Sequence, residues 1–154
     1  LESLQPEEIE AVLAHELGHF KLKHIQKRLL STFALSLVAL ALLGWLAGQD
    51  WFYHGLGVSQ ASPWMALLLF MMVLPVFTFF VQPLMSLLSR KHEFEADAYA
   101  VQQSSGADLI HALVKMYREN ASTLTPDPLY SAFHDSHPPA PVRISHISAN
   151  MSTT

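Results

Sequence analysis

The chain has 154 residues, of which 51% are hydrophobic and only 14% are charged. Average soluble domains carry about 25% charged residues, so this composition excludes an ordinary soluble domain as well as disorder and collagen. The formal net charge of −4 provides no basic surface for nucleic acid, and the absence of cysteine excludes disulfides and thiolate metal sites. The nine histidines therefore become the residues of greatest chemical interest.

The first predicted element is a helix that begins at Pro6 and continues through Gln26, inside a cytosolic segment of residues 1–28. Proline is favoured at the first helical position because its fixed φ suits a helix and its missing N–H is not needed there. Carboxylates in the first turn stabilise the positive end of the helix dipole. The chain supplies them at Glu7, Glu8 and Glu10.

This helix carries the sequence His-Glu-Leu-Gly-His at residues 15–19. The spacing of four places His15 and His19 on one face of the helix, where both imidazoles can bind one metal ion. Glu16 is offset by one position, so it is placed to act on water at the metal instead of binding the metal. Gly18 leaves room for a neighbouring backbone. The motif therefore predicts two metal ligands and a carboxylate beside a metal-bound water.

Two uncharged stretches, residues 29–48 and 64–84, are predicted to be transmembrane helices joined by a non-cytoplasmic loop at 49–63. The first would extend about 30 Å as a helix, which matches the hydrocarbon thickness of a bilayer. Pro75 is expected to bend the second. The alternative, two buried helices of a soluble core, would need more surrounding protein than the roughly 90 polar-flank residues supply.

The positive charges predict that both flanks of this hairpin face the cytoplasm. Lys and Arg precede the first span and follow the second, whereas the connecting loop contains neither. These residues are Lys21, Lys23, Lys27, Arg28, Arg90 and Lys91. Because the hairpin returns the chain to the side that it left, the segments 1–28 and 85–154 can meet at one metal ion.

A catalytic zinc needs a third protein ligand, and the motif alone can arise by chance, so a second signal is required. Residues 85–154 offer Glu93 and Asp97 at helical spacing. An ordinary solvated acidic face is the alternative reading of this pair. Beside the His-Glu-x-x-His motif, the pair favours a joined metal site.

Small residues distinguish Glu93 from its neighbours as the third ligand. Ala96 and Ala100 lie on the face of Glu93, and such small residues allow two helices to approach closely. His92 and Glu95 are the rival ligands, but both point away from this small-residue face. We therefore prefer Glu93.

Three blocks of the sequence resemble a known family. They are LQPEEIEAVLAHELGHFKLKH at residues 4–24, SRKHEFEADAYAV at 89–101 and DPLYSAFHDSHPPAPVRI at 127–144. In this order they are similar to the C-terminal portion of the type I CAAX prenyl proteases. These are integral-membrane zinc endopeptidases, and bacterial heat-shock membrane proteases are among their relatives.

The resemblance implies a role for each motif residue. His15, His19 and Glu93 would bind one Zn²⁺ per chain, Glu16 would be the general base, and Asp97 would orient a ligand histidine. The resemblance also implies further transmembrane helices upstream of this segment.

The resemblance places His137 in the substrate cleft, where it would stabilise the transition state. Pro138 and Pro139 stiffen the chain after it, although a rigid surface turn explains the same sequence. Val142 stands where the family has a glutamate, which leaves open whether Arg143 binds substrate or anchors the loop. The remaining histidines are interpreted as surface or packing residues: His24, His54, His111, His134 and His146.

The sequence thus predicts an all-α membrane protein in which zincin-like catalytic helices are joined by a two-helix transmembrane hairpin. We expect a zinc metalloendopeptidase that acts on peptide or protein substrates, with its site on the cytoplasmic side, and a bacterial inner membrane in preference to the endoplasmic reticulum. The competing hypothesis is a non-catalytic zinc-binding module or transporter piece, which would place polar ligands within the spans. A third is a protease segment that requires its upstream helices to act.

Overall fold

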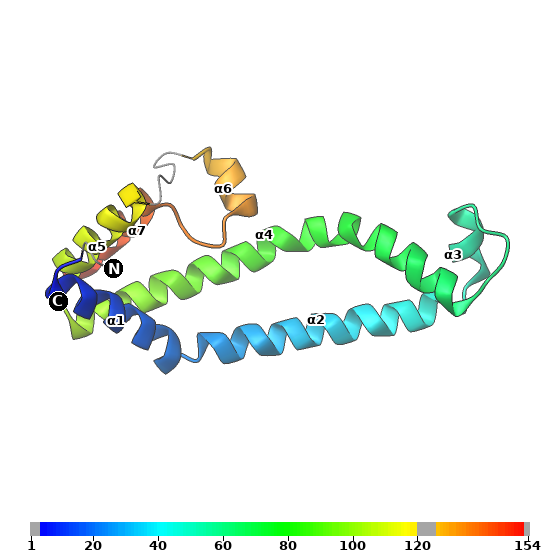
Figure 1. Cartoon of the computed structure of the whole chain (residues 1–154), viewed down its shortest axis with the longest axis horizontal. Helices are drawn as coiled ribbons and strands as arrows, with labels where there is room; N and C mark the ends of the chain where they lie inside the picture. The colour runs from blue at the N-terminus through cyan, green and yellow to red at the C-terminus, as the bar shows by residue number, and fades with distance from the viewer. Residues whose placement is uncertain (1–3, 120–125, 153–154) are drawn as a thin grey trace. The chain divides into compact units, whose positions relative to one another are not determined.

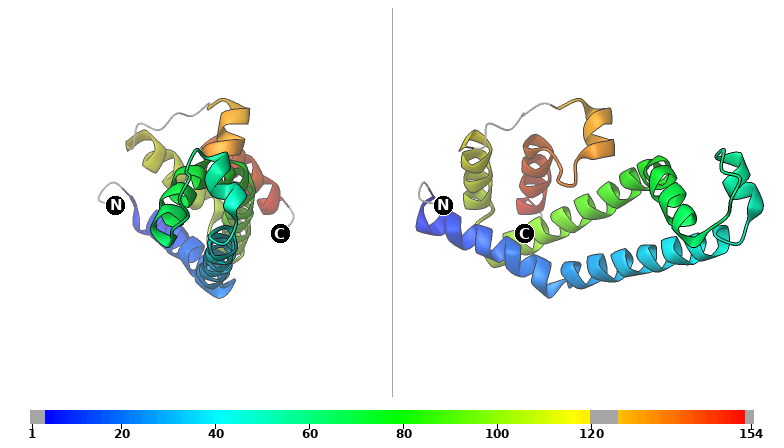
Figure 2. Two further views of the ribbon diagram at one scale, coloured as in Figure 1. Left: turned by 90° about the vertical axis from the view of Figure 1, so that its right-hand side faces the viewer. Right: turned by 45° about the vertical axis from the view of Figure 1, so that its right-hand side comes forward.

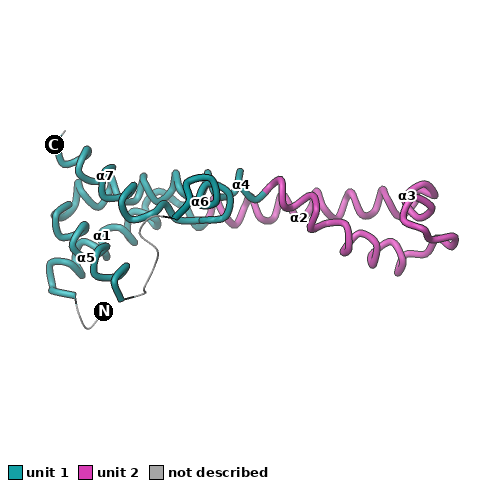
Figure 3. Tube along the Cα trace, turned by 90° about the horizontal axis from the view of Figure 1, so that it is seen from above, with its two compact units in different colours: residues 1–25, 82–154 teal, residues 26–81 magenta. Residues whose placement is uncertain are grey.

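A computed structural model describes residues 4–119 and 126–152, and these form α-helices with no strand among them (Figure 1). The helices are α1 (Pro6–Lys21), α2 (His24–Leu46), α3 (Asp50–Gly55), α4 (Pro63–Gln103), α5 (Gly106–Glu119), α6 (Pro128–His134) and α7 (Ala140–Met151). The chain divides into two compact units: unit 1 comprises Leu1–Ile25 and Gln82–Thr154, and unit 2 comprises Gln26–Val81 (Figure 3). The expectation of an all-α structure is confirmed for the described residues.

The single helix expected to continue through Gln26 is instead two helices. α1 ends at Lys21 and α2 begins at His24. Between them, Lys23 has a φ of 58°, in the left-handed region that residues with a side chain rarely adopt. No glycine or proline marks this break in the sequence, so the continuous hydrophobic pattern did not reveal it.

Unit 1 has a core built largely from small and aliphatic side chains. α5 packs against both α1 and α7, and the last turns of α4 complete the core (Figure 2). Its buried members are Ala11, Ala14, Ala100, Leu109, Leu113 and Ile147. Alanines on α1 and α4 let the backbones of these helices come close, which brings their polar side chains within reach of one another.

α1 and α4 lie close together at Gly18. A Cβ added to Gly18 would lie 3.1 Å from the Cα of Ala96 and 3.2 Å from the Cβ of Tyr99. Ala96 and Ala100 are completely buried. The predicted roles of Gly18 and of the small-residue face are therefore matched by the packing.

A polar contact also joins α1 to α5. The ammonium of Lys115 donates a hydrogen bond of 2.7 Å to Oε2 of Glu8, and the same oxygen accepts one from the backbone N–H of Gln5. The Lys115 hydrogen bond, and then that of Gln5, hold the pKa of Glu8 below its usual value. The glutamate that caps α1 thus also fixes the neighbouring helix.

Unit 2 contains an aromatic core at the segment expected to be a loop. Part of that segment forms α3, which buries Phe52 and Tyr53 against Phe70 of α4. The hydroxyl of Tyr53 donates a hydrogen bond of 2.9 Å to the carbonyl of Ala47 at the end of α2. The connection between the two long helices is therefore a packed element.

The two apolar helices of the predicted hairpin are α2 and the first part of α4. Only 6% of the most apolar window of α2 and 17% of that of α4 is buried, so the described chain does not enclose them in a soluble core. α4 contains 41 residues and continues through Pro75 to Gln103. The second predicted span at 64–84 and the segment that carries Glu93 thus belong to one helix.

Candidate active site

The first part of the site is the histidine pair on α1. One helical turn separates His15 from His19, and their Nε2 atoms lie 3.1 Å apart. His15 is buried, His19 is partly buried, and Glu16 between them is exposed. The two imidazole nitrogens therefore face each other from one side of the helix.

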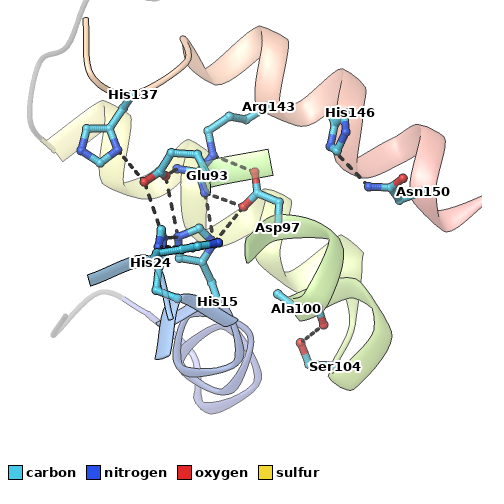
Figure 4. Close-up of polar contacts among 11 residues, drawn as sticks. His15, His24, Glu93, Asp97, Ala100, Ser104, His137, Arg143, His146 and Asn150 are labelled. Atoms are coloured by element: carbon cyan, nitrogen blue, oxygen red, sulfur yellow. Dashed lines mark hydrogen bonds and ion pairs between the residues drawn. The ribbon is translucent and has the colours of Figure 1, made fainter. Parts of the chain in front are cut away.

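Glu93 reaches this pair from α4, as Figure 4 shows. Its Oε1 lies 3.5 Å from Nε2 of His19, and its Oε2 lies 3.8 Å from Nε2 of His15. Ligands at 2.0–2.1 Å from a tetrahedral zinc ion are separated from one another by about 3.3 Å. The three separations between these donor atoms are close to that value.

The tautomer of the His15 ring makes this arrangement suitable for a cation. Its Nδ1 lies 2.9 Å from Oδ1 of Asp97 and 3.4 Å from Nη2 of Arg143, so the closer carboxylate identifies Nδ1 as the proton donor. In the neutral ring, Nε2 then carries a lone pair directed toward His19 and Glu93. A site of two imidazoles and one carboxylate is a typical donor set for zinc.

Asp97 and Arg143 form a buried pair behind the histidines. The guanidinium donates hydrogen bonds from Nε and Nη2 to the two carboxylate oxygens, with a Nε to Oδ2 distance of 2.9 Å. Burial opposes ionisation of Asp97, but its hydrogen bonds to His15 and Arg143 outweigh that effect and lower its pKa. Burial likewise opposes the charge of Arg143, and the Asp97 carboxylate raises its pKa. Both groups therefore remain charged at neutral pH.

Arg143 lies on α7, the helix that follows the His137 segment. Its Nη1 also lies 3.4 Å from Oε2 of Glu93, so one side chain contacts both Glu93 and Asp97. Val142, where the resemblance implied a missing glutamate, is 49% exposed. The substitution at Val142 does not prevent Arg143 from pairing with Asp97.

His137 lies on the opposite side of Glu93 from the α1 histidines (Figure 4). Its Nδ1 is 3.1 Å from Oε1 of Glu93, and its side chain is 65% exposed. Burial alone would raise the pKa of Glu93, but the hydrogen bond from His137 and the charge of Arg143 lower it. Glu93 is therefore an ionised carboxylate, as a metal ligand must be.

His19 is also in the protonation state that a metal requires. Burial, and then the charge of His15, lower its pKa. At neutral pH the ring is uncharged and retains a lone pair for coordination.

These side chains line one cavity of about 350 Å³. Glu16 and His137 border it together with the histidine pair and Glu93, and aliphatic side chains of α1 and α5 form the remaining wall. Larger cavities occur elsewhere in each unit, with apolar linings. The smaller cavity is the one that combines metal-binding groups with a carboxylate available for proton transfer.

The two rival ligands, His92 and Glu95, lie against His24. Glu95 contacts His24 and Lys91, and His92 stacks on His24 with ring centroids 4.2 Å apart. Glu93 is thus the α4 residue that the structure places beside His15 and His19, as preferred from the sequence.

His24, interpreted from the sequence as a surface or packing residue, is buried and makes polar contacts that the sequence did not indicate. Its side chain is only 3% exposed, and its two ring nitrogens contact His19 and Glu95. Sequence reasoning missed this residue because five positions separate it from His19, a spacing that would not bring them together on one helix. The other four histidines given this interpretation lie at exposed or partly exposed positions: His54, His111, His134 and His146.

Comparisons with known proteins agree with this site. Residues 1–151 match peptidase family M48. The chain is 36% identical over 141 residues to a CAAX prenyl protease 1 homolog of Arabidopsis thaliana, covering 92% of this chain and 33% of that protein. It is 32% identical over 154 residues to CAAX prenyl protease 1 of Saccharomyces cerevisiae, covering 90% of this chain and 34% of that protein.

A solved structure extends the comparison to the fold. The crystal structure of S. mikatae Ste24p superimposes with a TM-score of 0.82 at 32% sequence identity, over 95% of this chain and 37% of that one. The chain therefore spans about a third of the length of the proteins that it matches. Since one family accounts for nearly all of the sequence and a related structure reproduces its helices, this chain belongs to peptidase family M48, and its resemblance to the type I CAAX prenyl proteases is confirmed.

Proposed function

We propose that this segment is the catalytic part of an integral-membrane zinc metalloendopeptidase. The observation that carries the proposal is the convergence of His15, His19 and Glu93, whose donor atoms lie within 4.8 Å of one another in a cavity bordered by Glu16. Family membership supports a metal-dependent peptidase. The identity of the metal as zinc is supported by the nitrogen and oxygen donor set and the donor separations.

Zinc bound by these three side chains would polarise a scissile carbonyl and acidify a water molecule. Glu16 borders the cavity without belonging to the ligand group, so its carboxylate would take a proton from a water molecule in the cavity and would pass it to the departing amine. His137 donates a hydrogen bond to the carbonyl oxygen as negative charge develops there. Water is the nucleophile, so no covalent enzyme intermediate forms.

Asp97 and Arg143 hold this arrangement in place through their contacts with His15 and Glu93. Asp97 fixes the tautomer and orientation of His15 through Nδ1. Arg143 joins α7, the helix that follows the His137 segment, to Glu93 and Asp97 of α4. The loop that presents His137 to the cavity is thereby fixed at its C-terminal end.

The names of the relatives indicate the substrate class. Several are called CAAX prenyl protease 1, so we propose that prenylated C-terminal peptides are the substrates, and membrane proteins subject to quality control are the second class to be tested. Comparing cleavage of a farnesylated peptide with that of the same peptide lacking the farnesyl group separates the two.

The protein is proposed to place this site on the cytoplasmic side of its membrane. The support is the distribution of Lys and Arg around α2 and the apolar part of α4. The relatives are about three times as long as this segment, which supports further transmembrane helices in the complete protein. The choice between a bacterial inner membrane and the endoplasmic reticulum stays a prediction, and the relatives named above are eukaryotic.

The non-catalytic alternative has less support. A transporter module would place its ligands within the spans, whereas His15, His19 and Glu93 all belong to unit 1 and lie outside both predicted spans. Hydrolysis needs a proton acceptor such as the exposed Glu16 carboxylate at the cavity, whereas transport does not.

The proposal is tested by Glu16→Gln in the purified full-length protein. The amide preserves the size of the side chain but cannot accept a proton, so we expect bound zinc to stay at about one per chain while the rate of peptide cleavage falls by roughly 10²-fold to 10⁴-fold. Zinc is measured by elemental analysis, and cleavage by release of a labelled peptide fragment.

Glu10→Gln is the matched control, because Glu10 is an exposed glutamate on the same helix that does not line the cavity. It should retain both zinc and activity. Full activity in Glu16→Gln would overturn the assigned base, and absence of zinc from the parent protein would overturn the metal site.

A further inference from the structure

A chain of hydrogen bonds continues from His19 away from the proposed metal. Nδ1 of His24 lies 3.0 Å from Nδ1 of His19, and Nε2 of His24 lies 3.0 Å from Oε2 of Glu95. Glu95 in turn lies 3.8 Å from the ammonium of Lys91. Two charged side chains on α4 are therefore linked to a proposed zinc ligand through one buried imidazole.

The break between α1 and α2 creates this link. On a continuous helix, side chains five residues apart diverge by about 140° around the axis, so His24 would point away from His19. The left-handed backbone at Lys23 redirects the chain and brings the two rings within hydrogen-bond distance. The strained residue thus lies at the position that allows the contact.

With both imidazole rings neutral, only one placement of the ring protons of His19 and His24 fits these contacts. The Nε2 of His19 must keep its lone pair to bind a metal, so its Nδ1 carries the proton and donates to Nδ1 of His24. That nitrogen must then be an acceptor, which places the proton of His24 on Nε2, where it donates to the carboxylate of Glu95. Every group in the chain is satisfied by this pattern.

A second metal site at His24, His92 and Glu95 is the competing interpretation, because their donor atoms also lie within 4.8 Å. The rings of His24 and His92 are stacked, with an interplanar angle of 12°. The lone pairs of parallel rings lie in parallel planes and do not converge on one ion. Both nitrogens of His24 already have partners, so a metal there would require the contact with His19 to break.

We infer that His24 is a positioning residue that, together with Glu95, fixes the tautomer and orientation of His19 toward the metal. The inference rests on the proposed metal site. His15 receives the corresponding support directly from Asp97, whereas His19 receives it through an intervening imidazole. Each of the two ligand histidines thus has its Nδ1 held by a network that ends on a carboxylate of α4.

Three substitutions of His24 distinguish a positioning role of this residue from a packing role. In Asn the side-chain oxygen occupies the place of Nδ1 and can accept the proton of His19, whereas in Gln the terminal amide occupies the place of Nε2 and can reach only Glu95. His24→Ala provides neither contact. Zinc affinity of the full-length protein is measured by competition with a chelator of known affinity.

We expect His24→Ala and His24→Gln to weaken zinc binding by about 10-fold to 100-fold, the usual effect of losing a partner of a ligand histidine. His24→Asn should recover most of this loss, because it restores an acceptor at the position that contacts His19. A packing role would give a different order, since Gln fills more of the buried volume than Asn.

His92→Phe is the matched control. It retains a ring to stack on His24, which is the contact that the structure records between them, and it leaves both nitrogens of His24 bonded. Its zinc affinity should equal that of the parent. The visible spectrum of the cobalt-substituted protein supplies a second readout, which should shift in His24→Ala and His24→Gln and remain unchanged in His92→Phe.

Parent-like zinc affinity in His24→Ala would overturn the inference, as would equal affinities for the Asn and Gln variants. A loss in His92→Phe as large as that in His24→Ala would favour the second metal site. The proposed function is tested separately by the parent and by His15→Ala: if the parent binds no zinc, or if His15→Ala binds it normally, the proposed metal site itself is wrong.

Discussion

Glu93 and Asp97 are carboxylates on the same face of α4, yet the structure gives them different surroundings. Glu93 faces the Nε2 atoms of both α1 histidines and contacts the exposed His137. Asp97 is completely buried, where it contacts Nδ1 of His15 and the guanidinium of Arg143. One carboxylate is therefore available to a metal ion, and the other is committed to holding a ligand.

This difference predicts the order of two substitutions. Glu93→Ala removes one of three proposed ligands and should weaken zinc binding far more than Asp97→Asn, for which the expected loss is about 10-fold to 100-fold. Chelator competition measures both affinities. If Glu93→Ala binds zinc like the parent, the third-ligand role passes to a different residue.

The position of His137 predicts a variant that keeps metal and loses rate. His137→Ala should retain about one zinc per chain, while kcat falls by roughly 10²-fold to 10³-fold, the usual effect of losing one donor to a developing oxyanion. Steady-state kinetics and elemental analysis test the two parts. Loss of zinc would make His137 a ligand, and normal turnover would make it part of a surface turn.

At the scale of single residues, the motif spacings indicated which side chains lie together, whereas the turn at Lys23 left no signal in the sequence. The spacing of four between His15 and His19, and the small residues beside Glu93, were sufficient to predict which side chains the fold brings together. His24 could not be found in this way, because its contact depends on a left-handed residue that nothing in the local sequence indicates. The pairing of Arg143 with Asp97 was also not predicted, because they lie on different helices and no spacing in the sequence links them.

The packing of α1 against α4 is controlled by one glycine. The atoms nearest to an added Cβ at Gly18 are the Cα and carbonyl oxygen of Ala96 and the Cβ of Tyr99, none of which can move without its backbone. Because Glu93 lies on the same helix as Ala96, any separation of the two helices also separates the metal-binding groups.

Gly18→Ala should therefore affect metal binding more than folding. The higher helix propensity of alanine favours the variant by about 1 kcal/mol, which offsets much of the roughly 1–3 kcal/mol that overpacking costs. We expect little change in thermal stability of the metal-free protein and at least a 10-fold loss of zinc affinity, because the added Cβ would lie only 3.1 Å from the Cα of Ala96 and would push α4 away from the α1 histidines. Calorimetry and chelator competition measure these quantities.

Gly44→Ala is the control for this substitution. Gly44 is also inside a helix, but a Cβ there would meet nothing within 4 Å. Zinc affinity should be unchanged in this variant. An unchanged affinity in Gly18→Ala as well would mean that the two helices adjust without moving the site.

The sequence indicated the apolar part of α4 and the Glu93 segment as separate elements, whereas they form one helix of 41 residues. Hydropathy changes sharply between the two parts, and that change suggested a boundary that the backbone does not have. The helix periodicity of each part was nevertheless read correctly. Conversely, the expected loop between the spans contains α3, whose aromatic side chains bury themselves locally.

For the molecule as a whole, the charge distribution predicts a topology. This segment has no cysteine, so a thiol introduced into it is the only one that the segment contributes to the labelling. Ser59→Cys, in the connecting segment, should react with an impermeant reagent from the non-cytoplasmic side, and Gln103→Cys, at the end of α4, only from the cytoplasmic side. Ser59 is preferred to Gly57, whose φ of 80° a cysteine would not readily adopt.

Labelling is performed on sealed vesicles of both orientations, and detergent-solubilised protein provides the control for intrinsic reactivity. Reaction of both thiols from the same side would contradict the hairpin. It would also contradict the meeting of the two flanks on which the proposed catalytic site depends.

The site draws its parts from distant points along the chain, since 128 residues separate His15 from Arg143. A ribosome makes the chain from its N-terminus, so the histidine pair of α1 is complete long before Glu93 exists, and Arg143 follows later still. During that interval the nascent chain holds only two of the three proposed ligands, which are too few for a stable catalytic zinc site. On the proposed function, the metal is therefore acquired only after the segment that carries Glu93 has been synthesised, and an unfinished chain is inactive as a protease.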